Sequence, residues 1–299
     1  MWLALAFCSA FLLGLYDVSK KHSLRGNAVL PILFINTLVA SMIFAPLIIG
    51  SYLNMPLLNG SVWYVQPYEW SVQRLIILKA FIVLSSWLFG YFAMKHLPIT
   101  IVGPINATRP VMVLVGAMLV FGERLNLYQW IGVTLAITSI FLLSIAGKRE
   151  GIDFKRNKWI LFLFLAAVMG AISGLYDKFI IQRVEPITVQ SWYNVYQVLI
   201  MCPVLALLWY PQRKKSTPFQ WRWSILLIPV LLSLADLAYF FALSYDEAMI
   251  SIVSMIRRGS VVVSFAFGAF IFSEKNLKTK VVDLVLILIG MIFLYLGSR

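Results

Sequence analysis

The sequence predicts an all-α membrane protein with ten transmembrane helices in two inverted five-helix repeats, and three observations lead to this prediction. Of its 299 residues, 61% are hydrophobic and 12% are charged, whereas a soluble domain is roughly half apolar and a quarter charged. Apolar runs of about 20 residues, enough to cross the hydrocarbon core of a bilayer, recur along the chain. A short motif also recurs: the sequence GLYD begins at Gly14 and again at Gly174.

Apolar length and the turn signals between apolar runs predict the individual helices. They are expected near residues 2–21, 29–49, 73–94, 98–121, 126–146, 158–181, 187–209, 224–244, 248–272 and 278–297. The first run lacks the positive n-region and small-residue cleavage site of a secretory signal peptide, so we expect it to be a permanent span. The polar segment GKREGIDFKRNK separates five helices from five. We therefore expect a first repeat at 1–147, a polar linker at 148–157 and a second repeat at 158–299.

The two halves share further motifs. FIN at 34–36 matches WYN at 192–194, and FGERLNL at 121–127 matches FSEKNLK at 272–278. Each half has an odd number of predicted spans, so the second half is predicted to enter the membrane inverted relative to the first. Inverted repeats are a known construction of secondary transporters, because two similar halves can exchange conformations around a central site.

With these motifs the chain resembles the ten-helix EamA-type branch of the drug/metabolite transporter superfamily. One of that family's features is a fourth helix with a proline thirteen residues before a closing acid, here Pro110 and Glu123. The second half keeps the acid, Glu274, but has Val261 in place of the proline. The resemblance implies that the first four helices of each half line a cavity and that the fifth lies outside. It also implies export of amino acids or related metabolites, and a bacterial inner (plasma) membrane location.

Two aspartates lie near the ends of apolar runs, Asp17 and Asp177. An ionised group in hydrocarbon costs several kcal/mol, so each needs a cavity, a partner or an interfacial position. One interpretation is structural: Asp17 pairs with Lys21, and Tyr16 and Tyr176 belong to an interfacial aromatic belt. The other is that these acids face the cavity as sites for a coupling ion or proton, with the tyrosines beside the substrate.

Three arginines are stronger candidates, because Arg109, Arg257 and Arg258 lie some ten residues inside their predicted spans. They could form buried ion pairs with Asp236 or with the two aspartates above, and so hold the bundle together. Alternatively they bind a carboxylate or phosphate, which suits the forked donors of guanidinium. Asp236 is itself a candidate substrate-binding residue, because it lies in the middle of a span.

The second helix of each half adds amide side chains. Gln190, Asn194 and Gln197 follow helical spacing in one half, and Asn36 lies in the other. One polar face per helix suits a cavity wall that binds substrate. Hydrogen bonding between helices is the ordinary alternative.

Other functions find little support in the sequence. It has two histidines and two cysteines and no H-E-x-x-H, nucleophile elbow, phosphate loop or C-x-x-C motif, so we expect no enzyme, metal or cofactor. The net charge of +13 comes mainly from short loops, which indicates membrane orientation and not nucleic-acid binding. The expected partners are the lipid bilayer, a small-molecule substrate and a coupling proton; the alternative is a non-transporting receptor or scaffold.

Orientation is left open by two opposed indications. The loops after the odd-numbered predicted helices carry most of the lysines and arginines. By the positive-inside rule both termini then lie outside the cytoplasm. The family resemblance implies cytoplasmic termini instead. Substrate identity and oligomeric state are likewise not fixed by the sequence.

Overall fold

The structure is a computed structural model that describes residues 2–109, 111–112, 125–149, 151–181, 183–243, 245, 256–272 and 277–297. Within these residues all regular secondary structure is helical. Seven of the described helices are long and apolar enough to cross a membrane. The prediction of an all-α membrane protein is therefore confirmed.

The first half contains α1 (Trp2–Leu24), α2 (Val29–Tyr52), α3 (Trp70–His96), α4 (Ile99–Ala107) and α6 (Leu127–Arg149). The second contains α7 (Lys158–Ile181), α8 (Pro186–Val204), η1 (Leu205–Trp209), α9 (Ser224–Leu243), α11 (Ser260–Phe272) and α12 (Leu277–Gly297). The predicted helices agree with these bounds within a few residues wherever both ends are described. The expected spans 98–121 and 248–272 extend over residues outside the description.

Local chemistry explains two of the helix ends. The turn after α1 contains Gly26 with a φ of 65°, a left-handed conformation that glycine adopts without strain. The predicted helix 187–209 instead changes from α to π geometry at Leu205. Pro203 lies just before this point, and the Tyr210 N–H bonds the carbonyl five residues back, at 3.0 Å. A proline removes one helical N–H, which favours such a local rearrangement.

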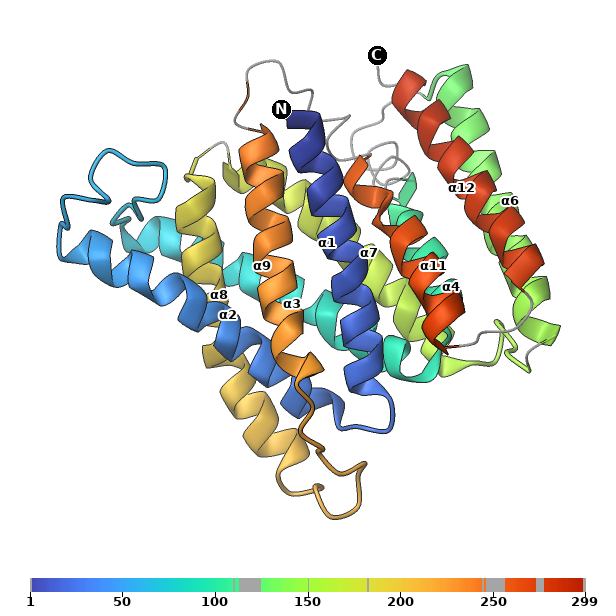
Figure 1. Ribbon diagram of the computed structural model, residues 1–299, viewed down its shortest axis with the longest axis horizontal. Helices are drawn as coiled ribbons and strands as arrows, with labels where there is room; N and C mark the ends of the chain where they lie inside the picture. The colour runs from blue at the N-terminus through green and yellow to red at the C-terminus, as the bar shows by residue number, and fades with distance from the viewer. Residues whose placement is uncertain are drawn as a thin grey trace.

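Packing between helices follows the division into halves. In Figure 1, α1 and α7 run in opposite directions, and both termini lie at the same end. α1 packs against α9 as α7 packs against α3, while α2 packs on α8 and α6 on α12. If the two halves are exchanged helix by helix, each of these contacts becomes itself or another on the same list. The packing therefore has the approximate two-fold character that duplicated halves require.

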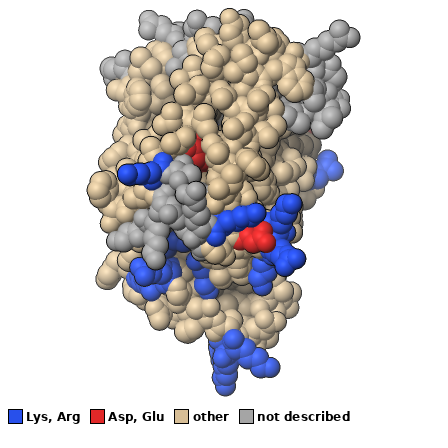
Figure 2. Space-filling view, turned by 90° about the vertical axis from the view of Figure 1, so that its right-hand side faces the viewer, with Lys and Arg blue, Asp and Glu red and all other residues tan. Residues whose placement is uncertain are grey.

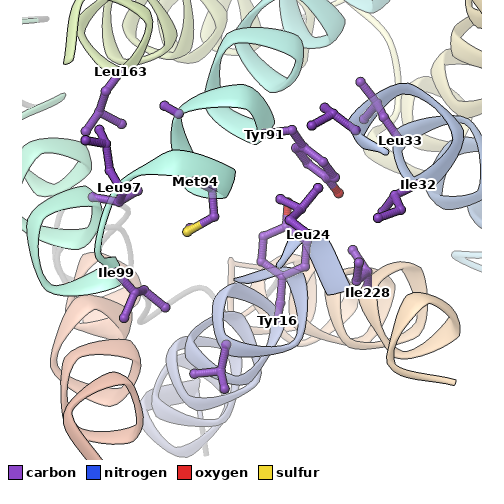
Figure 3. Packing of buried hydrophobic residues seen from close by; sticks show 14 of the residues in the cluster. Tyr16, Leu24, Ile32, Leu33, Tyr91, Met94, Leu97, Ile99, Leu163 and Ile228 are labelled. Atoms are coloured by element: carbon purple, nitrogen blue, oxygen red, sulfur yellow. The ribbon is translucent and has the colours of Figure 1, made fainter. Parts of the chain in front are cut away.

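The α6–α12 pair stands at one side of the bundle (Figure 1). Its helices approach closely, because a Cβ added to Gly132 would lie 2.9 Å from the Gly290 carbonyl oxygen. In a membrane, helices associate through such close van der Waals contact between small residues. The main core lies elsewhere, where Tyr16, Tyr91 and Ile32 pack among buried aliphatic side chains (Figure 3).

Connector 53–69, between α2 and α3, is bound to the second half. The Gln66 N–H donates to Thr188 Oγ1 at 3.0 Å, and the Tyr68 hydroxyl donates to Glu185 Oε2 at 2.6 Å. Burial and the bond to Glu185 raise the pKa of Tyr68 to about 12. These contacts fasten the connector to the start of α8.

The opposite end of the molecule has its own contacts between halves. Asn27 Nδ2 donates to the Gln220 carbonyl at 2.6 Å, and the Gln220 N–H donates to Asn27 Oδ1 at 2.8 Å. The hydroxyls of Ser23 and Ser224 are 2.7 Å apart. In Figure 2 lysine and arginine side chains gather over the lower half of the visible face, away from the end that holds the termini in Figure 1.

Candidate functional site

Arg109 follows the end of α4 and reaches the second half. Its Nη2 donates to Asn106 Oδ1 at 3.0 Å, while its buried Nε has no partner among the described residues. The guanidinium lies against α7, because a Cβ added to Gly170 would be 2.6 Å from Arg109 Cζ. The guanidinium therefore packs directly on the glycine, and a larger residue at this point would displace it. A side chain of the first half is thus held against the first helix of the second.

Arg257 is occupied within the protein. Its Nη2 forms an ion pair with Asp236 Oδ1 on α9, and its guanidinium lies over the Tyr239 ring, 4.4 Å from the centroid. The Arg257 and Asp236 side chains remain 21% and 17% exposed. This ion pair agrees with the interpretation in which the intramembrane arginines pair with acids and hold the helix bundle together.

Arg258 differs from its neighbour in sequence. It lies deep in the bundle, and the charged groups in its surroundings are the guanidiniums of Arg109 and Arg257. Among the described residues no carboxylate lies within ion-pair distance of Arg109 or Arg258. Both arginines are nevertheless partly accessible, so water or a ligand has space beside them. Charges placed deep in a membrane protein need such a partner.

The first helix brings Asp17 to the same region. Asp17 Oδ1 accepts from Lys20 Nζ at 2.7 Å, and Asp17 lies within electrostatic range of Arg109. The suggested pairing of Asp17 with Lys21 is therefore wrong, because the ion-pair partner of Asp17 is Lys20. Lys21 Nζ instead donates to the carbonyls of Met94 and Leu97 at the end of α3. Positions three and four residues apart share a helix face, so spacing alone could not choose between the lysines.

Tyr16 is 5% exposed and lies within electrostatic range of Asp17, Arg109 and Asp236. Figure 3 shows its ring beside Tyr91. Lys20 Nζ lies 4.3 Å from the centroid of the Tyr16 ring. The cluster thus contains side chains from α1, α3 and α9 and from the arginine-bearing segments.

Lys20 and Tyr91 are members of this cluster that sequence reasoning missed. A lysine three residues after an intramembrane aspartate was the available signal for Lys20. Tyr91 lies in an apolar run, and nothing in its sequence context distinguishes it from a packing residue.

The second GLYD motif is placed differently. The Tyr176 hydroxyl donates to the Leu75 carbonyl at 3.0 Å, which ties α7 to α3. The side chain of Asp177 lies outside the described part of the structure. In sequence, Ile180 and Ile181 stand where the first half has Lys20 and Lys21.

The predicted amide residues are all buried. Asn194 Nδ2 donates to the Gln190 carbonyl at 2.8 Å within α8. For Asn36 and Gln197, both polar side-chain atoms lack a partner among the described residues, as does Gln190 Oε1. An unsatisfied buried polar group costs about 1–3 kcal/mol. These amides therefore have unused hydrogen-bonding capacity.

The described residues contain no group of three or more histidine, cysteine, aspartate or glutamate side chains that could hold a metal ion.

Comparison with known proteins identifies both the fold and the family of this chain. A solved structure described as the crystal structure of a protein matches with a TM-score of 0.63 and 15% identity, over 99% of this chain and 97% of the other. At this identity the match shows a shared fold. No curated protein matches the sequence. The model of the EamA-like transporter family matches residues 1–145 and again residues 157–296. The chain is an integral membrane protein and belongs to the EamA-like transporter family, whose members carry small molecules.

Proposed function

We propose that this protein is a secondary transporter that exports small polar organic metabolites, such as amino acids, by alternating access. In this proposal ten spans form two inverted repeats, at 1–147 and 158–299, joined by a polar linker at 148–157. The opposed directions of α1 and α7 support the inversion. The packing that maps onto itself when the halves are exchanged supports two units that can rock against each other.

The observation that carries the proposal is a pair of arginines, Arg109 and Arg258, that have no carboxylate partner among the described residues. One comes from each half, and the two lie within electrostatic range of each other. Like charges at close range are costly in a low-dielectric interior, and a bound carboxylate or phosphate between them would remove that cost. A substrate held there would touch both halves, and its binding would depend on their arrangement. Export of an amino acid would place its carboxylate at this point.

Other residues predicted from the sequence complete the proposed site. Tyr16, Tyr176, Asn36, Asn194 and Gln197 would orient the substrate, and the Arg257–Asp236 pair would border it. Asp17 and Asp177 are the proposed coupling-ion or proton sites. For Asp17 this means that its bond to Lys20 is exchanged during the cycle.

Orientation is proposed from the charge distribution. On the face shown in Figure 2, lysine and arginine side chains gather in the half of the molecule away from the termini. We place that end in the cytoplasm of a bacterial cell with the protein in the inner membrane, so both termini face outward. A reporter enzyme that is active only outside the cytoplasm, fused after Arg299, tests this assignment. An inactive reporter in a fusion that reaches the membrane would reverse it.

The test of function is flux into proteoliposomes with a panel of amino acids and organic acids, with and without a proton gradient. Arg258→Gln is expected to yield folded protein whose flux falls by roughly tenfold to a hundredfold, because a hydrogen bond to a charged group contributes about 1.5–3 kcal/mol. Arg183→Gln is the matched control. Arg183 is exposed in the turn after α7 and bonds the carbonyl of Phe179 near the end of that helix, so flux should be unchanged.

The alternative function, a non-transporting receptor or scaffold, predicts a different outcome. In that case no substrate and no gradient would produce flux, and a partner protein would bind tightly to the purified chain. That combination would end the transport proposal.

A further inference from the structure

We propose that the unpartnered carboxamides of α2 and α8 form a second binding subsite, separate from the arginines, which takes an uncharged carboxamide-like group of the same substrate. This inference rests on the proposed transport function. It narrows the substrate to an organic anion that also carries a neutral group able to donate and accept hydrogen bonds.

The first observation that supports this subsite is that two of the carboxamides are completely buried. Asn36 and Gln197 are each 0% exposed. Neither the oxygen nor the nitrogen of either carboxamide has a partner among the described residues. Native proteins rarely leave both ends of a buried amide unpaired, and each such case calls for an explanation. A transported ligand that forms the missing hydrogen bonds would explain these two amides and would agree with the function of the family.

The second support is the behaviour of neighbouring polar groups. Thr37, next to Asn36, donates its hydroxyl to the Phe34 carbonyl at 2.8 Å. Asn194, one turn before Gln197, donates to the Gln190 carbonyl at 2.8 Å. Polar side chains here can therefore satisfy themselves on their own helix. Asn36 and Gln197 do not, and Gln190 Oε1 and Ser191 Oγ on α8 are also unpartnered.

The third support is the position of the two helices. α2 and α8 pack against each other and come from opposite halves. A group bound between them touches both halves, just as an anion between the two arginines would. α2 also packs against α9, the helix that bears Asp236, and α8 packs against α3, the helix that bears Tyr91. The amides thus lie on helices adjacent to those of the charged cluster.

The chemistry of the subsite selects a neutral group. A carboxamide offers two N–H donors and a carbonyl acceptor, so two of them match a partner that both donates and accepts. No acid or base among the described residues forms an ion pair or hydrogen bond with Asn36 or Gln197. An ammonium placed there would lose its hydration without gaining a counter-charge, and the buried cation Lys79 already lies over the ring of Tyr193, one turn before Gln197. The subsite should therefore prefer a primary amide over an ammonium.

The experiment compares two anions of the same shape. Succinamate carries a carboxylate and a carboxamide, and 4-methylpentanoate has an isopropyl group in place of the carboxamide. Glutaramate and 5-methylhexanoate form the same pair with one more methylene, so two separations between subsites are sampled. Binding is measured on purified full-length protein by ligand-induced change in melting temperature, and transport by flux into proteoliposomes.

The wild-type protein is expected to bind at least one amide anion about tenfold more tightly than its isopropyl counterpart, because two hydrogen bonds distinguish them. Asn36→Leu and Gln197→Leu should reduce this ratio to near one. Thr37→Val is the control, because it removes a buried polar group that is already satisfied, and it should keep the ratio. Both leucine variants should also melt no lower than wild type, since they remove unsatisfied polar atoms.

Three results would overturn the subsite. One is equal stabilisation by both members of each pair in the wild type, including no stabilisation by either. Another is a preference for the amide that survives in both leucine variants. The third is a leucine variant that does not fold, because such loss would assign the amides to bonds within the protein. If other substrates still cross the membrane in any of these cases, the transport function stands and the second subsite alone is rejected.

Discussion

The first helices of the two halves, α1 and α7, share a motif but not its surroundings. Gly14 is closely packed, because a Cβ there would lie 2.5 Å from Val263 Cβ and 3.0 Å from the Ser260 carbonyl oxygen on α11. Among the described residues, a Cβ at the equivalent Gly174 would meet nothing within 4 Å. The duplication has preserved the sequence motif, whereas the contacts at its two copies have diverged. Equivalent positions therefore predict equivalent places in the fold better than equivalent roles.

The largest expected difference lies at these glycines. Gly14→Ala should reduce stability by about 2 kcal/mol, because the methyl group overlaps both a side chain and a backbone oxygen of α11. Gly174→Ala should leave stability unchanged or raise it by up to about 1 kcal/mol, the helical preference for alanine. Melting temperatures of the detergent-purified variants measure both. Equal losses at the two positions would refute the asymmetry.

A smaller difference is expected one turn later. Lys20→Met leaves Asp17 without its ion-pair partner in a partly buried place, and we expect a loss of about 1–2 kcal/mol. Ile180→Met, the matching change in α7, should cost less than about 1 kcal/mol, since an aliphatic side chain of similar volume replaces another. Denaturation of the two variants side by side gives the comparison. A greater loss for Ile180→Met would contradict the assignment of a separate role to Lys20.

The smallest effect concerns the tyrosine of the second motif. Tyr176→Phe removes the hydrogen bond to the Leu75 carbonyl and should cost roughly 0.5–1 kcal/mol. Flux should be retained if this bond only joins α7 to α3. A loss of flux at normal stability would instead support direct contact between Tyr176 and substrate, and would bring the two copies of the motif closer in function.

Much of the fold could be predicted because it depends on apolar length and repetition, both of which are local or periodic features of the sequence. The site could be predicted only as a set of residue types. Arg257 and Arg258 are adjacent, and consecutive helical residues point in directions about 100° apart. Which of them meets Asp236 depends on the rotation of one helix against another, which no spacing within the chain records. The contact between Arg109 and Gly170 likewise joins segments that are distant in sequence.

The pi-helical end of α8 shows the same limit on a local scale. Pro203 signalled a perturbation, but Pro46 and Pro229 also lie inside helices that continue past them. Whether a proline changes the helix geometry depends on what surrounds the freed carbonyl. The sequence therefore shows where a proline lies in a helix, but not whether the helix geometry changes there.

Connector 53–69 has a consequence for how this molecule can be assembled. An ancestral protein with one half could pair with a second copy of itself, since each copy would make the same contacts. Here the connector of the first half forms hydrogen bonds with Thr188 and Glu185 at the start of α8. The matching junction of the second half lies at the other end of the molecule, where Asn27 and Gln220 meet instead. Because the two junctions use different residues, two copies of a single half would not reproduce both sets of hydrogen bonds.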